Sequence, residues 1–305
     1  MAKNPLEVKL GSLILKNPVI TASGTFGYGE EYESFIDIDK LGGIVTKGIT
    51  LKPRLGNQPP RIVETPSGIL NSIGLQNDGV EAFIQKKLPY LSRLETKVIV
   101  NIAGESIKEY IELTERLSGQ GGIDAIEINI SCPNITGGGM VFGVDKELTY
   151  RVVSRVREKT FLPLIVKLTP NVGDIVSIAR SAEDAGADIV SLTNTFLGMA
   201  IDVERRKPTL GNIFGGLSGP SIKPISLRMV YQVYKEVKIP LIGIGGISST
   251  KDALEFIMAG SSAIQVGTAN FFDPTVTLKI IDGLTEFCKT NRIKNIKEIV
   301  GVAHL

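Results

Sequence analysis

Short apolar runs rich in β-branched residues recur along the chain, and stretches with helical spacing separate most of them. Such alternation is typical of a parallel sheet whose strands are connected through helices. The eight predicted strands lie at residues 18–23, 43–48, 98–103, 125–131, 164–169, 188–194, 240–246 and 263–269. The predicted helices cover residues 80–94, 107–117, 146–159, 174–185, 225–237, 250–258 and 274–290.

Eight such units most simply close into a (β/α)₈ TIM barrel with right-handed crossovers. The alternative is an open, doubly wound sheet. Residues 8–15 predict an N-terminal hairpin, which we expect to cover the end of the barrel opposite the active site. Because no linker, repeat or low-complexity tract divides the sequence, we predict a single domain over residues 1–305.

Two connections are much longer than ordinary loops, namely residues 49–78 and 195–224. Long connections in a compact domain are usually lids or binding loops. Both follow predicted strands, so both belong at the C-terminal face of the barrel, where the active sites of this fold lie. The sequence therefore predicts long active-site loops at that face.

Polar side chains alternate with isoleucines in the strand at residues 125–131. The isoleucines suit the helix-facing side, which directs Glu127, Asn129 and Ser131 toward the barrel axis. Polar groups buried there must find hydrogen-bond partners. This strand is therefore the first indication of a site inside the barrel mouth.

Lys47, Asn101 and Lys167 occupy comparable positions near the ends of three other strands. An ion pair with Glu127 would explain either lysine alone. Two lysines and several asparagines that converge on one rim favour a ligand site instead.

Glycine-rich segments end the last two strands, at residues 243–248 and 265–269. The loops after these strands often bind phosphate in TIM barrels, because glycine lets backbone N–H groups approach the ligand. The two segments together predict a cofactor or substrate that carries a phosphate.

Composition narrows the chemistry that this site can perform. The net charge of +2 gives no indication of nucleic-acid binding, and no apolar window is long enough for a membrane span. The chain starts without the apolar core of a signal peptide, and we expect a cytoplasmic protein. The single histidine, His304, lies next to the C-terminus, which argues against histidine-based triads and histidine-rich metal sites, and we expect no metal.

The two cysteines match no disulfide framework or metal-binding pattern. Cys288 falls within a predicted helix and is expected to be buried and inert. Cys132 follows a predicted strand at the active rim and precedes three glycines, where a thiol can act as a base or nucleophile. Without a histidine partner, a base beside an electron-accepting cofactor is the more plausible role for Cys132.

The sequence resembles the dihydroorotate dehydrogenases over nearly its whole length. The order and spacing of several motifs carry the resemblance, namely TASGTFGYG (21–29), VTKGIT (45–50), NSIGLQN (71–77), NISCPN (129–134), LTNT (192–195), GGLSGP (215–220), GIGGI (243–247) and VGTA (266–269). After CPN the relatives usually carry a Val-Lys-like pair, whereas Ile135 and Thr136 stand here. This departure concerns the active-site loop and leaves the base in place.

The resemblance implies oxidation of dihydroorotate to orotate in pyrimidine biosynthesis, with FMN as the hydride acceptor and Cys132 as the base that removes the C5 proton. Lys167 and Lys47 are the further catalytic residues that it implies. The cofactor contacts carried over are Ser23, Lys47, Gly48, Asn101, Asn129, Lys167, Thr193, Gly219, Gly245, Gly246, Gly267 and Thr268. The substrate contacts carried over are Lys47, Asn71, Ser72, Ile73, Gly74, Leu75, Asn129, Asn194 and Thr195.

Within this family, Cys132 in place of serine resembles the cytosolic class 1 enzymes, and residues 64–83 and 200–228 resemble the 1B branch. That branch implies a partner subunit with FAD and a [2Fe–2S] cluster, NAD⁺ as the final acceptor, and a homodimer core or heterotetramer. Two cysteines are too few for such a cluster, which needs about four thiolates, so the partner must hold it.

Several other readings stay open on the sequence alone. A fumarate-using 1A enzyme shares the same chemistry, and dihydropyrimidine dehydrogenase and dihydrouridine synthase have related barrels, although NSIGLQN and NISCPN favour the orotate branch. Outside the flavin enzymes, a Schiff-base aldolase would use Lys167 or Lys47, and a binding or scaffold subunit would have no catalytic activity.

Overall fold

The computed structural model describes residues 4–131 and 142–305, and within them eight parallel strands form a closed barrel. The strands follow one another around the barrel in chain order, and the last strand pairs with the first. They are β3 (Val19–Thr21), β4 (Gly43–Val45), β7 (Lys97–Ile102), β8 (Ala125–Asn129), β9 (Leu164–Lys167), β10 (Ile189–Leu192), β15 (Leu241–Ile244) and β16 (Ser261–Val266). The predicted TIM barrel is confirmed, and the open-sheet alternative is wrong.

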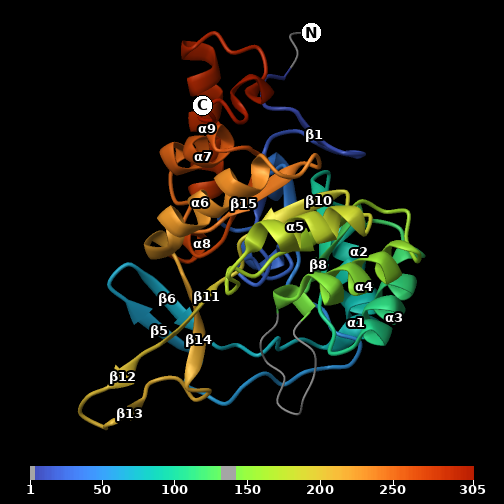
Figure 1. The fold of residues 1–305 in the computed structure, drawn as a ribbon, viewed down its shortest axis with the longest axis vertical. Helices are drawn as coiled ribbons and strands as arrows, with labels where there is room; N and C mark the ends of the chain where they lie inside the picture. Colours follow the sequence, from blue (N-terminus) through green and yellow to red (C-terminus); the bar gives the residue numbers. More distant parts are fainter. Residues whose placement is uncertain (1–3, 132–141) are drawn as a thin grey trace.

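Helices surround this barrel on the outside (Figure 1). They are α1 (Gly79–Ala82), α2 (Leu88–Leu91), α3 (Ile107–Ser118), α4 (Lys146–Arg157), α5 (Ile175–Asp184), α6 (Lys223–Tyr234), α7 (Thr250–Met258), α8 (Ala269–Phe272) and α9 (Val276–Thr290). Short 3₁₀ turns complete the set, at η1 (Glu30–Tyr32), η2 (Ile38–Lys40), η4 (Phe142–Val144), η5 (Pro220–Ile222) and η6 (Ile296–Ile299). Apolar side chains on the inner faces of the helices pack against the outward residues of the strands and form one continuous core.

One predicted helix differs from its prediction. Residues 80–94 form α1 and α2 joined by a π-helical turn, η3 (Phe83–Lys87), and the last helical residue is Leu91. Pro89 has no N–H to donate to the carbonyl four residues earlier, so regular α-helical hydrogen bonding cannot continue through this segment.

The N-terminal hairpin pairs β1 (Val8–Leu10) with β2 (Leu13–Leu15). Its turn residue Gly11 lies against Asp188, the residue that precedes β10. Leu10 and Leu15 are fully buried. The hairpin therefore covers the N-terminal end of the barrel, as predicted.

The two long connections form a structure that the sequence did not indicate. They contribute β5 (Ile62–Thr65) and β6 (Gly68–Asn71) from the first, and β11 (Phe196–Met199) and β14 (Phe214–Ser218) from the second. These strands make one antiparallel sheet in the order β11-β14-β6-β5. Figure 1 shows this sheet beyond the end of the barrel opposite the chain termini.

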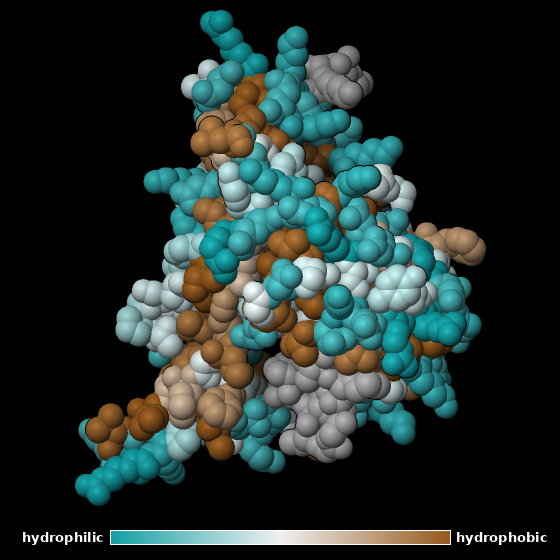
Figure 2. Space-filling view, in the orientation of Figure 1, coloured by the Kyte–Doolittle hydropathy of each residue, from teal (hydrophilic) through white to brown (hydrophobic). Residues whose placement is uncertain are grey.

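A smaller pair, β12 (Ile201–Asp202) and β13 (Lys207–Pro208), extends from this sheet as an arm. Ile201 and Val203 on the arm are 61% and 81% exposed, and Figure 2 shows hydrophobic side chains at its end. Leu197 and Phe214, nearer the barrel, instead line the cavity described below.

Candidate active site

A cavity of about 1600 Å³ lies between the carboxyl ends of the barrel strands and the four-stranded sheet. Every predicted cofactor or substrate residue within the described chain lines it. The set comprises Ser23, Lys47, Gly48, Asn71, Ser72, Ile73, Gly74, Leu75, Asn101, Asn129, Lys167, Thr193, Asn194, Thr195, Gly219, Gly245, Gly246, Gly267 and Thr268. Cys132 lies outside the described residues, and Ser131, which precedes it, lines the cavity.

A buried carboxylate organises the floor of this cavity. Glu127 on β8 has no exposed surface and accepts hydrogen bonds from Asn101 Nδ2 (2.7 Å), Ser191 Oγ (2.9 Å) and Gln265 Nε2 (2.8 Å). These donors come from β7, β10 and β16, so Glu127 points to the barrel axis, as the alternation of β8 predicts. Three donors from three different strands thus satisfy the oxygens of this buried carboxyl group.

Lys167 at the end of β9 lies over this carboxylate. Its Nζ is 3.8 Å from Glu127 Oε1 and donates to Ser23 Oγ at 3.2 Å. The side chain is only 5% exposed, so the ammonium needs the negative charge beneath it. The ion pair and the ligand-site readings of Lys167 are therefore compatible, because Lys167 also borders the cavity.

Lys47 has a different environment. Burial lowers the pKa of its ammonium, and Arg61 acts in the same direction, while the charges of Asp78 and Glu31 partly oppose the shift. Within the described residues no carboxylate lies within 4 Å of its Nζ. A partly desolvated cation on the wall of a cavity is suited to binding an anionic group of a ligand.

An amide cluster lies beside β8 at the point where the described chain is interrupted. Asn194 Nδ2 donates to Asn129 Oδ1 at 3.3 Å and to Ser131 Oγ. The Tyr110 hydroxyl donates to the backbone oxygen of Asn129 at 2.7 Å and so fixes the end of the strand. These contacts fix amide, carbonyl and hydroxyl groups in the lining of the cavity. Such a set of groups is suited to a ligand with several carbonyl and N–H groups.

The glycine-rich loops meet at another side of the cavity. Gly245 and Gly246 have φ angles of 128° and 72°, which favour glycine. A Cβ on Gly246 would lie 2.8 Å from the backbone oxygen of Gly219, so the two loops are in close contact. Thr268 Oγ1 donates to Ser218 Oγ at 2.8 Å, which ties the loop after β16 to the end of β14.

Two polar atoms at the cavity have no partner among the described residues. They are Asn101 Oδ1 and Ser72 Oγ, both buried. Buried polar atoms are seldom left without hydrogen bonds, so both atoms are candidates for contact with a ligand group in the cavity.

Comparison with known proteins agrees with this geometry. A sequence model of the family described as dihydroorotate dehydrogenase matches residues 5–288. The chain belongs to this family. Among its relatives are three proteins named dihydroorotate dehydrogenase B (NAD(+)), catalytic subunit. They come from Desulforamulus reducens (57% identity, covering 98% of this chain and 99% of the relative), Geotalea uraniireducens (54%, 99% and 99%) and Parabacteroides distasonis (56%, 97% and 97%).

This membership confirms the resemblance to the dihydroorotate dehydrogenases that the motifs indicated. The names of the relatives also agree with the 1B branch indicated by the sequence. In the described residues, no group of three or more histidine, cysteine, aspartate or glutamate side chains is arranged to hold a metal ion. No helix within the same residues is long and apolar enough to cross a membrane.

Some residues that line the cavity were not predicted from the sequence. Ser218, Phe214 and Leu197 line it from β14 and β11. Ser218 lies inside the GGLSGP motif, which could have indicated it. Phe214 and Leu197 carry no local signal, because they reach the cavity only when the two long connections pair.

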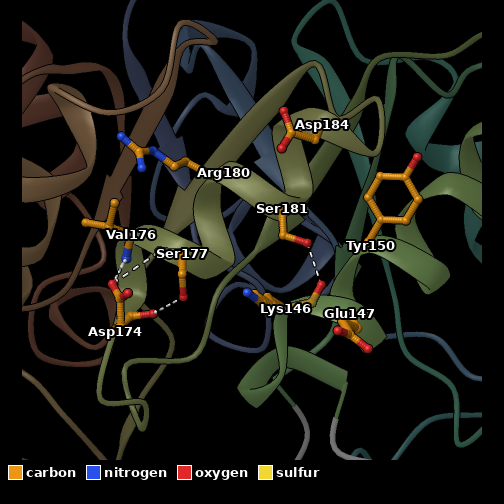
Figure 3. Close-up of a pocket in the computed structure, with 9 residues that line it drawn as sticks. All are labelled: Lys146, Glu147, Tyr150, Asp174, Val176, Ser177, Arg180, Ser181 and Asp184. Atoms are coloured by element: carbon orange, nitrogen blue, oxygen red, sulfur yellow. Dashed lines mark hydrogen bonds between the residues drawn. The ribbon is translucent and has the colours of Figure 1, made fainter.

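A second, smaller hollow of about 410 Å³ lies between α4 and α5 on the outside of the barrel (Figure 3). Three of its polar side chains already have partners. Asp174 accepts the backbone N–H groups of Val176 and Ser177, Ser181 donates to the backbone of Lys146, and Arg180 pairs with Glu236. Within the described chain, this hollow shares no residue with the cavity at the barrel mouth.

Proposed function

We propose that this chain is the FMN-dependent catalytic subunit that oxidises dihydroorotate to orotate in pyrimidine biosynthesis. The observation that carries the proposal is the cavity itself, where two buried or half-buried lysines, an amide cluster and two close-packed glycine loops face one space. Its volume of about 1600 Å³ leaves room for a cofactor and a small substrate together. Membership of the family supplies the reaction.

The residues present fit a flavin mononucleotide. The buried Asn101 Oδ1 lacks a partner and can accept from an N–H of the flavin ring. The contact between Gly246 and Gly219 leaves no space for side chains, so backbone groups face the region proposed for the phosphate. In the proposal, the phosphate is held by Gly219, Gly245, Gly246, Gly267 and Thr268, and the ring by Ser23, Lys47, Gly48, Asn101, Asn129, Lys167 and Thr193.

Bound FMN supplies the electron sink that takes the hydride from C6 of dihydroorotate. Cys132, as a thiolate, removes the proton from C5. Lys167 supplies a positive charge next to the cofactor ring, and Glu127 balances that charge and keeps the side chain in place. In this proposal the chain thus provides a base on one side of the substrate and, on the other side, the positive charge of Lys167 beside the cofactor.

We assign substrate binding to the amide cluster and to residues 71–75, at the end of β6 and in the loop that follows it. The proposed contacts are Lys47, Asn71, Ser72, Ile73, Gly74, Leu75, Asn129, Asn194 and Thr195. Lys47 is suited to the carboxylate of dihydroorotate, and the unpartnered Ser72 Oγ to one of its ring groups.

The proposal includes an electron-transfer partner. Because the relatives are named catalytic subunits of NAD(+)-linked enzymes, we infer that electrons pass to NAD⁺ through a second subunit carrying FAD and a [2Fe–2S] cluster. Two cysteines in the whole chain cannot supply the four cluster ligands. We further propose a single-domain, cytoplasmic chain that assembles as a homodimer core or heterotetramer.

The experiment is purification of the chain alone and with the candidate partner, followed by turnover of dihydroorotate with NAD⁺, fumarate or a dye. We expect a yellow chain with about one FMN per polypeptide, dye reduction by the chain alone, and NAD⁺ reduction only with the partner. Fumarate reduction by the chain alone would move it to the 1A branch. A colourless chain that takes up no FMN would refute the proposal, and borohydride trapping on Lys167 would support an aldolase instead.

A further inference from the structure

A second buried carboxylate lies next to the glycine loop that follows β15 and is not part of the cavity lining. Asp252, in the first turn of α7, is 8% exposed and does not line the cavity. The start of α7 is an ordinary capped helix start, because Ser249 is the N-cap and its side chain accepts a hydrogen bond from the backbone N–H of Asp252. The contacts of its carboxylate, however, reach well beyond the helix.

Asp252 accepts four hydrogen bonds from two different segments. Oδ2 accepts from the backbone N–H of Ser248 (3.0 Å), from Ser248 Oγ (3.0 Å) and from Ser249 Oγ (2.8 Å). Oδ1 accepts from Lys223 Nζ at 2.6 Å. Burial opposes the charged form of this carboxyl, but the bonds from Lys223, Ser248 and Ser249 outweigh it and hold the pKa of Asp252 below its usual value.

These two segments are the walls of the proposed phosphate site. Ser248 ends the loop that carries Gly245 and Gly246, and Lys223 is the first residue of α6, directly after the turn that begins at Gly219. A Cβ on Gly246 would lie 3.0 Å from the Lys223 backbone nitrogen. The loop and the start of α6 therefore touch on the cavity side, and the Asp252 carboxylate joins them from behind.

We propose that Asp252 is a positioning residue that sets the affinity of the site for the phosphate of FMN by holding the loop after β15 against the start of α6. Loss of this link lets the two walls separate and weakens backbone contacts to the phosphate. The flavin ring lies mainly among other residues in the proposed function, on which this inference rests. Thr193 is the ring residue bonded to α6, through Ser226 Oγ at 2.9 Å, so the loss should be larger for the phosphate contacts than for the ring contacts.

The test compares two flavins that differ only in the phosphate. The apo forms of the parent chain and of Asp252→Asn are titrated with FMN and with riboflavin, and binding is followed by quenching of flavin fluorescence. We expect Asp252→Asn to weaken FMN binding roughly tenfold or more, as loss of a charge-assisted contact implies. Riboflavin binding should change less than about twofold. Lys223→Met cuts the same link from the other side and should give the same FMN-selective loss, which keeps the test decisive if Asp252→Asn fails to fold.

Glu255→Gln is the matched control. Glu255 also pairs with Lys223 Nζ, at 2.9 Å, but the structure records no contact between Glu255 and the glycine loop. Its substitution should leave FMN binding within about twofold of the parent. An equal loss for FMN and riboflavin, or no loss for either, would overturn the inference while leaving the proposed function intact. A parent chain that binds neither flavin would refute both.

Discussion

The ion pair between Glu127 and Lys167 gives a quantitative test of the cavity floor. Glu127→Gln keeps the size of the side chain, so it removes the charge without opening a cavity. At 3.8 Å and an effective dielectric constant of about 20, the attraction between the two charges is about 4 kcal/mol. Because both side chains are buried, removing either charge alone should destabilise the apo chain by about 3–5 kcal/mol.

The double variant Glu127→Gln/Lys167→Met separates this effect from general damage to the core. With both charges gone, neither group is left buried without a counter-ion, so the double variant should be roughly 2–4 kcal/mol more stable than the sum of the single changes predicts. Urea unfolding measures these differences, followed by far-UV circular dichroism because the chain has no tryptophan. Single effects that add to within about 0.5 kcal/mol would refute the ion pair as the element that holds Lys167.

Three further outcomes are expected from the site. Cys132→Ala should keep its flavin but lose about 10²–10⁴ in the rate of flavin reduction by dihydroorotate, and an unchanged stopped-flow rate would exclude this thiol as the base. Because burial lowers the pKa of Lys47, its ammonium loses its proton below the ordinary lysine range, so orotate binding should weaken as the pH rises toward 10.5. Lys47→Arg stays charged and should remove that part of the pH dependence, and coincident absorbance titrations of the two chains would contradict the assignment. Gly246→Ala should destabilise the apo chain by about 1–3 kcal/mol, since its φ is positive and Gly219 O would lie 2.8 Å from the new Cβ. In Gly267→Ala the new Cβ has no atom closer than 3.5 Å, so this variant should keep the melting temperature of the parent while it weakens FMN binding. Equal melting temperatures for Gly246→Ala and Gly267→Ala would show that the close contact at Gly246 does not affect stability.

The barrel could be predicted from sequence because its strands and helices have local signals. Each strand is a short β-branched run, and the alternation of β8 correctly directed Glu127 and Asn129 inward. The convergence of the candidate site residues on one cavity followed for the same reason, since the carboxyl ends of parallel strands meet at one rim. The helix predicted at residues 80–94 was less accurate, because a hydrophobic period does not distinguish an α-helix from the π-helical turn at Phe83–Lys87.

The four-stranded sheet could not be predicted in this way. Asn71 on β6 donates to the backbone oxygen of Gly216 on β14, two residues that are 145 positions apart. β14 contains Gly215 and Gly216, which are unfavourable in isolated strands and gave the segment the pattern of a loop. Asp252 was missed for a related reason, because an aspartate in the first turn of a helix is ordinary until its partners are known.

The pairing of β16 with β3 joins residues near the two ends of the chain, Val266 and Thr21 among them. During synthesis on the ribosome, β3 therefore waits for its second neighbour until almost the whole polypeptide has emerged. The glycine loops after β15 and β16 are produced equally late. With the phosphate site proposed above, a nascent chain would therefore bind FMN only late, and incomplete translation products would leave β3 with an open edge available for aggregation.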